Sequence, residues 1–185
     1  MAEVKLHIGC GKRYLKGYVH IDINEFEHID YRSNGRTLPM FQDNSVNLIY
    51  ASHMLEYFDR LEVVDVLKEW HRVLKKGGTL RLAVPDFEAL VKVYLKTKNL
   101  QLILGPMYGR WPLTDDTIIY HKTIYDFTSL DNVLSSVGFH NTHIWQWQDV
   151  FTGELEGYDD YSQAYFPHMD KKQGTLISLN VEAEK

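Results

Sequence analysis

The sequence contains one cysteine, Cys10, and no long apolar run. A lone thiol cannot form an internal disulfide, which favours a reducing compartment, and we therefore expect a cytoplasmic protein. No stretch approaches the roughly 20 apolar residues that a membrane-spanning helix needs. Residues 1–8 also lack the apolar core of a signal peptide. These absences predict a chain with no membrane partner.

Basic residues are few and scattered. The 20 Lys and Arg are outnumbered by 25 Asp and Glu, which gives a formal net charge of −5, and the basic clusters are short pairs. A nucleic-acid surface requires a basic stripe or patch. We therefore predict a small-molecule partner and no nucleic acid.

Several catalytic signatures are missing as well. The sequence has no GxSxG elbow and no P-loop, and its nine histidines include no HxxxH pair. The missing elbow and P-loop argue against a serine hydrolase and a P-loop nucleotidase. With only one cysteine available, a zinc site is also disfavoured, and we predict no metal.

Strand and helix patterns alternate along the 185 residues, a length that fits one domain, residues 1–185. The patterns predict strands over residues 4–8, 18–23, 28–31, 46–52, 79–84, 140–147 and 175–183. They predict helices over residues 59–76, 86–97 and 127–137, an irregular insertion over 105–117 and a polar segment over 153–173. This alternation is typical of a doubly wound, mostly parallel α/β sheet. The last two strands lack a helix between them, so we expect an antiparallel edge pair.

The beginning of the chain indicates a cofactor site. The first strand ends in Gly9-Cys10-Gly11, a tight turn that lets a ligand approach the backbone at the carboxyl edge of the sheet. The second strand ends in Asp22, whose carboxylate can hold a ribose diol. No third glycine follows where the dinucleotide fingerprint requires it. The connection over residues 9–17 is shorter than the dozen or more residues of a normal crossover, so its helix must shrink to a turn.

Later motifs make the pattern more specific. Ser33-Asn34-Gly35 follows the third strand, Ser52-His53-Met54-Leu55-Glu56 ends the fourth, and Lys75-Lys76-Gly77-Gly78 precedes the fifth. In this order and spacing, residues 4–86 resemble the class I S-adenosylmethionine-dependent methyltransferases, in particular the small methyltransferase type 11-like group. The resemblance implies a seven-stranded sheet in the order 3-2-1-4-5-7-6 with the last strand antiparallel.

The resemblance also implies S-adenosylmethionine as cofactor and S-adenosylhomocysteine as its product. Gly9, Cys10 and Gly11 match the family's glycine turn beside the methionine part of the cofactor. Asp22 matches the acid that holds the ribose hydroxyls.

The same resemblance places the adenine and the cofactor's amino group. Asn34 stands where the family usually has an aspartate toward the adenine amino group, and the Gly35 amide would address the ring. Asn34 is neutral, so it accepts more weakly than a carboxylate. Ser52 and His53 match the end of the fourth strand, whose carbonyl faces the amino group of the cofactor.

Methyl transfer to a hydroxyl needs an in-line acceptor and a base. The candidate catalytic residues lie after the fourth strand, beside the insertion and in the polar segment: His53, His121 and Asp160. The candidate acceptor contacts are one cation that suits an anionic group and tyrosines that suit stacking on a sugar-like ring: Arg110, Tyr120, Tyr125, Tyr161 and Tyr165. We expect residues 105–125 and 158–168 to cover the donor pocket, with His121, Tyr125 and Asp160 facing it.

The leading hypothesis is O-methylation of a small-molecule or glycan-linked acceptor. The glycan part comes from the tail, including residues 120–127 and 159–165, which resembles uncharacterised bacterial members that often accompany polysaccharide genes. One alternative is a cofactor-binding scaffold that has lost catalysis, as Asn34 and the short turn would permit. Another is a nicotinamide-dependent oxidoreductase, which the missing crossover helix disfavours.

Overall fold

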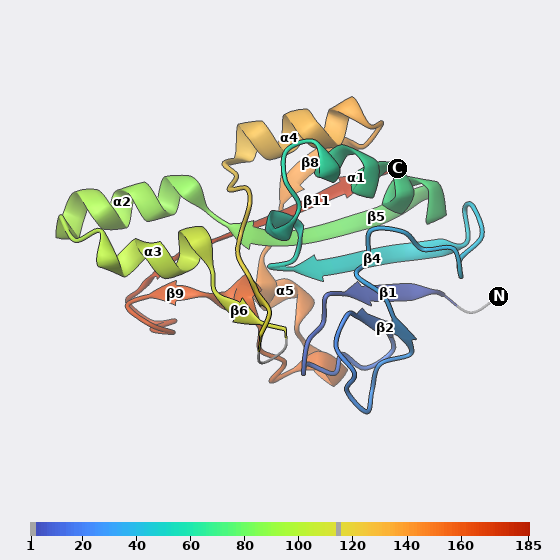
Figure 1. Cartoon of the computed structure of the whole chain (residues 1–185), viewed down its shortest axis with the longest axis horizontal. Coiled ribbons are helices and arrows are strands. Elements are labelled where there is room, and N and C mark those ends of the chain that lie inside the picture. Colours follow the sequence, from blue (N-terminus) through green and yellow to red (C-terminus); the bar gives the residue numbers. More distant parts are fainter. Residues whose placement is uncertain (1–2, 114–115) are drawn as a thin grey trace.

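A seven-stranded mixed sheet forms the centre of the protein, whose computed structural model describes residues 3–113 and 116–185. The strand order is β3-β2-β1-β4-β5-β11-β8 (Figure 1). The bounds are β1 Lys5–Ile8, β2 Val19–Asp22, β3 Tyr31–Arg32, β4 Val46–Ser52, β5 Leu74–Pro85, β8 His140–Ile144 and β11 Ser178–Glu184. Numbered along the chain, this is the predicted order 3-2-1-4-5-7-6. The last strand, β11, runs antiparallel to both neighbours, as predicted.

Five α-helices and three short 3-10 helices complete the larger elements of the described residues. They are α1 Glu62–Val73, α2 Phe87–Thr97, α3 Gln101–Tyr108, α4 Phe127–Ser136, α5 Trp147–Val150, η1 Leu55–Tyr57, η2 Gly153–Leu155 and η3 Tyr161–Gln163. Two small antiparallel pairs join β6 Trp111–Pro112 to β7 Ile118–Ile119, and β9 Tyr165–Phe166 to β10 Thr175–Leu176. The hairpin of α2 and α3 extends beyond the carboxyl ends of β4 and β5 (Figure 1).

The two faces of the sheet are covered in different ways. On one face, α1 and α4 pack through residues such as Trp70 and Leu130 onto Ile49 and Leu82. On the other face, Tyr50 and Trp145 are covered by the turn after β1, by α5 and by the chain that follows α5. The continuous apolar run in β4 reflects this double burial, because alternate residues of a strand point to opposite faces.

The connection between β1 and β2 contains no helix, as its length predicts. Residues 11–18 form turns, in which Arg13 N donates to Cys10 O at 3.1 Å and Tyr18 N donates to Leu15 O at 3.2 Å. Leu15 is buried and its amide donates to His20 Nε2 at 2.9 Å. Leu15 thus covers part of the sheet face on which a longer crossover would place a helix.

Several predicted boundaries are wrong. The helix expected over residues 59–76 ends at Val73, because Leu74 is already extended and pairs with Val46. The register between β4 and β5 then shifts, because the next pair is Leu48 with Thr79. The residues of β5 between Leu74 and Thr79 form a bulge, in which Gly77 has a φ of +72°. The expected strand over 140–147 ends at Ile144.

The insertion expected over residues 105–117 is only partly irregular. Its first residues belong to α3, which includes Pro106 near its end. Ile103 packs against Leu90 and Val93 of α2, and this apolar contact favours the helix over the Gly and Pro signals. The final strand is likewise split, since Ile177 leaves the sheet pairing and packs into the same cluster.

Candidate functional site

A pocket of about 230 Å³ opens at the carboxyl ends of β1, β2 and β4. Its lining includes most of the residues predicted to hold the cofactor: Gly9, Cys10, Gly11, Asp22, Asn34, Ser52 and His53. Ligands of open α/β sheets bind at this edge. The fold therefore brings together motifs that span more than 40 positions of the sequence. We call this cavity the donor pocket.

The glycine turn is shaped by close packing against Met54. Gly9 has a φ of +69°, and a Cβ at this position would overlap the side chain of Met54. Gly11 also has a positive φ, +56°, but a Cβ there would meet nothing. Between them, burial raises the pKa of the Cys10 thiol to about 12, so it remains protonated. The turn exposes backbone rather than reactive side chains to the pocket.

Asp22 is nearly buried and held by hydrogen bonds. Its Oδ2 accepts from Gly11 N at 2.8 Å, and its Oδ1 accepts from Asn24 N at 2.8 Å and Asn24 Nδ2 at 3.0 Å. A carboxylate has about four acceptor sites, so Oδ2 retains capacity for another donor such as a ribose hydroxyl. Asn24 also lines the pocket, a contact that the sequence analysis missed although it lies two residues beyond Asp22.

Asn34 lines the donor pocket, whereas Gly35 lies behind it. Asn34 Oδ1 accepts from Arg36 N at 3.0 Å, which leaves the side-chain amide group as the donor available to a ligand. The amide of Gly35 donates to Ser33 Oγ at 3.2 Å, and the expectation that this amide addresses the adenine ring stays a prediction.

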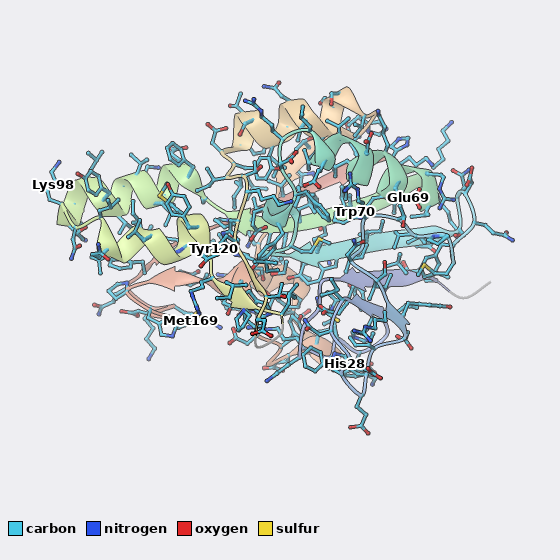
Figure 2. All side chains as sticks on the ribbon, viewed as in Figure 1. His28, Glu69, Trp70, Lys98, Tyr120 and Met169 are labelled. Atoms are coloured by element: carbon cyan, nitrogen blue, oxygen red, sulfur yellow. The ribbon has the colours of Figure 1, made fainter. Side chains whose placement is uncertain are left out.

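Gly35 also serves packing. Its carbonyl accepts from Trp70 Nε1 at 2.8 Å, and a Cβ on Gly35 would overlap Ile8 and Met54. Trp70 belongs to α1 and fills the layer between this helix and the sheet (Figure 2).

A second cavity, of about 310 Å³, adjoins the donor pocket, and we call it the acceptor pocket. Its walls come from residues 105–121 and 161–177, so both late segments reach the carboxyl edge of the sheet. The two cavities share four lining residues: His53, Tyr57, Trp111 and Tyr161. A ligand in one cavity therefore contacts the wall of the other.

Some predicted acceptor-site residues line this second cavity. Arg110, His121, Tyr161 and Tyr165 all do, together with His53. The structure also adds residues that the sequence analysis did not single out. Arg13 reaches the donor pocket and lies 4.6 Å from the centre of the Tyr161 ring; its position in the truncated crossover was the only sequence signal. No feature of the sequence within the insertion distinguishes Trp111 as a pocket residue.

Two tyrosines predicted to contact the acceptor lie elsewhere. Tyr125 is buried in the core under α1 and α4 and lines neither cavity, because its ring packs with the apolar face of the sheet. Tyr120 is 49% exposed and also lines neither cavity. Both expected contacts are corrected accordingly.

Asp160 is a core residue and does not face the donor pocket. It is 2% exposed, accepts a hydrogen bond from Tyr50 Oη at 2.6 Å, and caps η3 by accepting from Ser162 N at 2.8 Å. The polar segment around it was expected to be too polar for the core. Asp160, Ser162 and Gln163 of this segment are nevertheless buried, and they are held by hydrogen bonds such as the one that Asn180 Nδ2 of β11 donates to Ser162 O at 2.9 Å.

Two histidines and one glutamate meet behind the shared wall. His53 has a φ of +50°, and its Nδ1 lies 3.5 Å from Glu56 Oε1. His121 Nε2 lies 3.7 Å from the same oxygen. Burial lowers the pKa of His53 to about 3 and that of His121 as well, and burial raises the pKa of Glu56 to about 8. At neutral pH both imidazoles are therefore uncharged.

Neither a metal centre nor a membrane-crossing helix emerges from residues 3–113 and 116–185. No group of three or more His, Cys, Asp or Glu side chains there is arranged to hold a metal ion. No helix in these ranges is both long and apolar enough to span a bilayer.

Residues 6–82 match a family model described as a methyltransferase domain. Among solved structures, a methyltransferase from Methanosarcina mazei that depends on S-adenosylmethionine is 20% identical, with 100% of this chain and 94% of that chain covered and a TM-score of 0.59. A second such enzyme, from Archaeoglobus fulgidus, is 14% identical, with 100% and 86% covered and a TM-score of 0.58. DhpI, solved as its complex with S-adenosylhomocysteine, is 10% identical, with 98% and 76% covered and a TM-score of 0.57. No curated protein sequence matches the chain.

The sheet order and the pocket at its carboxyl edge define a class I methyltransferase fold. The domain match covers the stretch that holds the glycine turn, Asp22 and the end of β4. Residues 6–82 therefore match a methyltransferase domain, and the chain has the fold of methyltransferases that depend on S-adenosylmethionine, as the resemblance implied. These matches favour S-adenosylmethionine as the methyl donor over the alternative of a nicotinamide-dependent oxidoreductase.

Proposed function

We propose that this methyltransferase transfers the methyl group to a hydroxyl oxygen of a small, anionic, ring-containing acceptor bound in the acceptor pocket. The observation that carries the proposal is the wall shared by the two cavities, where His53 stands. In-line transfer requires donor and acceptor to meet end to end, within about 3–3.5 Å. Two adjoining cavities with one common wall provide that arrangement.

In the donor pocket, Asp22 would hold the ribose, Asn34 the adenine edge, and the turn from Gly9 to Gly11 the methionine part. The apolar lining from Met54 and Phe58 fits the remaining surface of the cofactor. When bound, S-adenosylmethionine supplies an activated methyl group and a neutral leaving group.

The lining of the acceptor pocket indicates the class of acceptor. Arg110, His121 and His168 line it, and no Asp or Glu does among the described residues. Arginine pairs well with carboxylate and phosphate groups. Trp111, Tyr161 and Tyr165 offer flat faces for a sugar-like ring. An acidic or phosphorylated sugar, free or glycan-linked, combines these features.

His53 and His121 are the proposed bases for the reaction. The acceptor oxygen forms the new C–O bond as the methyl carbon leaves sulfur, and the hydroxyl proton passes to an imidazole nitrogen. A neutral imidazole is the form that accepts a proton, and burial keeps both rings in that form. Both side chains are largely buried, at 12% and 8% exposed, which limits the contact of the imidazoles with bulk water.

A panel of matched sugars tests the proposal. Release of S-adenosylhomocysteine is measured with uronic acids and sugar phosphates and with their neutral counterparts. We expect turnover with an anionic member, and Arg110→Ala should raise KM for it at least tenfold, about 1.4 kcal/mol, while leaving the dissociation constant of S-adenosylhomocysteine unchanged. Lys92→Ala, on exposed α2, is the control for removal of a cation. Equal turnover of neutral and anionic sugars, or transfer only to amines, would contradict the proposal.

A further inference from the structure

Glu56 occupies an unusual position for an acidic residue. Its side chain is 0% exposed, and within the described part of the chain neither carboxyl oxygen has a hydrogen-bond partner. A buried carboxyl group without hydrogen bonds is unfavourable by several kcal/mol relative to water. The nearest polar atoms are His53 Nδ1 at 3.5 Å and His121 Nε2 at 3.7 Å, just beyond the usual N···O hydrogen-bond range.

The hydrogen-bond network fixes which nitrogen of His53 carries the proton. Ser178 Oγ donates its hydrogen to Asn180 Oδ1 at 2.9 Å, so the same oxygen must accept from His53 Nε2 at 3.1 Å. Asn180 cannot reverse this direction, because its Nδ2 donates to Ser162 O at 2.9 Å. In the neutral ring the hydrogen therefore sits on Nε2, and Nδ1 presents a lone pair to Glu56.

The same reasoning applies to His121. Its Nδ1 lies 3.1 Å from the carbonyl oxygen of Pro106, which can only accept. Nδ1 must donate, so Nε2 of the neutral ring presents its lone pair to Glu56. Two imidazole lone pairs from segments 68 positions apart thus face one carboxyl oxygen. This arrangement favours a protonated carboxyl group, which can donate to either ring.

Apart from the two imidazoles, the titratable side chains close to the Glu56 carboxyl group are the tyrosines Tyr57 and Tyr125, which are uncharged at neutral pH. Burial raises the pKa values of Tyr57 and Tyr125, and the nearby Glu56 raises them further. The main-chain oxygen of Glu56 accepts from Lys122 N at 2.8 Å, while the Lys122 ammonium is paired with Glu62. Arg13 faces His53 rather than Glu56 and helps to lower the pKa of that ring. The carboxyl group therefore has the two imidazoles as its proton partners.

We propose that Glu56 is a positioning residue that shares one proton with His53 and His121 and, in its ionised form, receives the acceptor's proton through them. The proposal rests on the proposed function, because it takes the acceptor hydroxyl to lie at the shared wall. Glu56 is fully buried and cannot touch the acceptor. The hydroxyl proton moves to an imidazole lone pair, the imidazolium is neutralised by the Glu56 carboxylate, and the proton then settles on that carboxylate. The cluster begins with one negative charge and ends neutral.

The protonation of the cluster is read from the imidazole nitrogens by NMR in protein saturated with S-adenosylhomocysteine. We expect the signals of His53 and His121 to move together between pH 6 and 9.5, with one midpoint near 8, where Glu56 titrates. In Glu56→Gln this shared step should disappear. The matched control is Glu182→Gln, since Glu182 lies 3.5 Å from His143 Nε2 and its replacement should alter the His143 signal alone.

A second variant keeps the test decisive if Glu56→Gln does not fold. In His121→Gln the shared step should remain visible at His53, but with a midpoint displaced by at least half a pH unit. Independent titration of the two histidines, persistence of the step in Glu56→Gln, or an unmoved midpoint in His121→Gln would overturn the proposal. These results are separate from the sugar panel, so a wrong acceptor class and a wrong role for Glu56 are distinguishable.

Discussion

Asp22 shows how one residue links the fold to the cofactor. Its carboxylate is anchored by the amides of Gly11 and Asn24, so the turn after β1 and the loop after β2 are tied together at the place where the ribose is expected. Because the anchors are backbone donors, the carboxylate is fixed before any ligand arrives.

Replacement of Asp22 by Ala should weaken binding of S-adenosylhomocysteine at least tenfold. Hydrogen bonds to a charged group contribute about 1.5–3 kcal/mol each, so the loss of one ribose contact is sufficient. Calorimetry gives the dissociation constant. Asp30→Ala is the control, because Asp30 accepts from His20 N at 2.8 Å but lines neither cavity. An Asp22→Ala protein that binds as tightly as wild type would show that another group holds the ribose.

Glu56 should make stability depend on pH. Its pKa is about 8 in the folded protein and lies near the ordinary value of 4.5 when the chain is unfolded, so between these values only the folded state holds the proton. The stability conferred by this difference is complete below pH 4.5 and is lost as pH rises toward 8. The slope approaches 1.4 kcal/mol per pH unit.

Urea unfolding of wild type and Glu56→Gln between pH 5 and 9 measures this effect. The free energy of unfolding of wild type should fall relative to that of the variant by roughly 1 kcal/mol per pH unit up to pH 8, then run parallel. His53 acts at lower pH in both proteins, since its pKa of about 3 means that stability is lost as pH falls below 6.5. Parallel curves throughout would mean that Glu56 is ionised in the folded state.

The sequence located the lining of the donor pocket better than the buried Glu56 beside it. Glycine turns and a strand-ending acid are local signals, and residues 9–11, Asp22 and Asn34 do line the cavity. The sequence pointed to Glu56 only weakly, through its spacing of three residues from His53. This spacing places both side chains on one side of a helical turn. Its burial depends on His121, which comes from a distant segment, so a local pattern cannot reveal it.

At the scale of elements, the segment over residues 153–173 departs most from expectation. Its polarity is typical of a solvated loop, yet Leu155 and Tyr158 pack with Tyr50 on the second face of the sheet. Asp160 then binds Tyr50 Oη from within this layer. Composition could not show this outcome, because polar residues are stable in a core when their partners come from elsewhere in the chain.

Tyr50→Phe should therefore destabilise the protein by about 1–3 kcal/mol, because Asp160 would lose a hydrogen bond inside the core. Chemical denaturation at neutral pH measures the change. Tyr94→Phe is the control, since Tyr94 is 38% exposed on α2. If both variants lose the same stability, the hydrogen bond to Asp160 contributes nothing specific.

At the scale of the whole molecule, the two cavities are joined through Trp111. This residue lines both, whereas Trp70 and Trp145 are buried away from them. Binding of S-adenosylhomocysteine should change the intrinsic fluorescence, and Trp111→Phe should remove most of that change while calorimetry still detects binding. A full fluorescence response in Trp111→Phe would place the ligand outside the donor pocket.

The two walls of the acceptor pocket differ in what else they do. The wall from residues 105–121 carries exposed side chains, such as Arg110 and Trp111. The wall from residues 161–177 belongs to a segment that includes Ser162 and Gln163, and these two residues are buried in the core. New acceptor preferences can therefore evolve readily through the first wall, where substitutions leave the core intact. Changes in the second wall alter folding and selectivity together, so a lineage that diversifies its substrates is expected to vary residues 105–121 first.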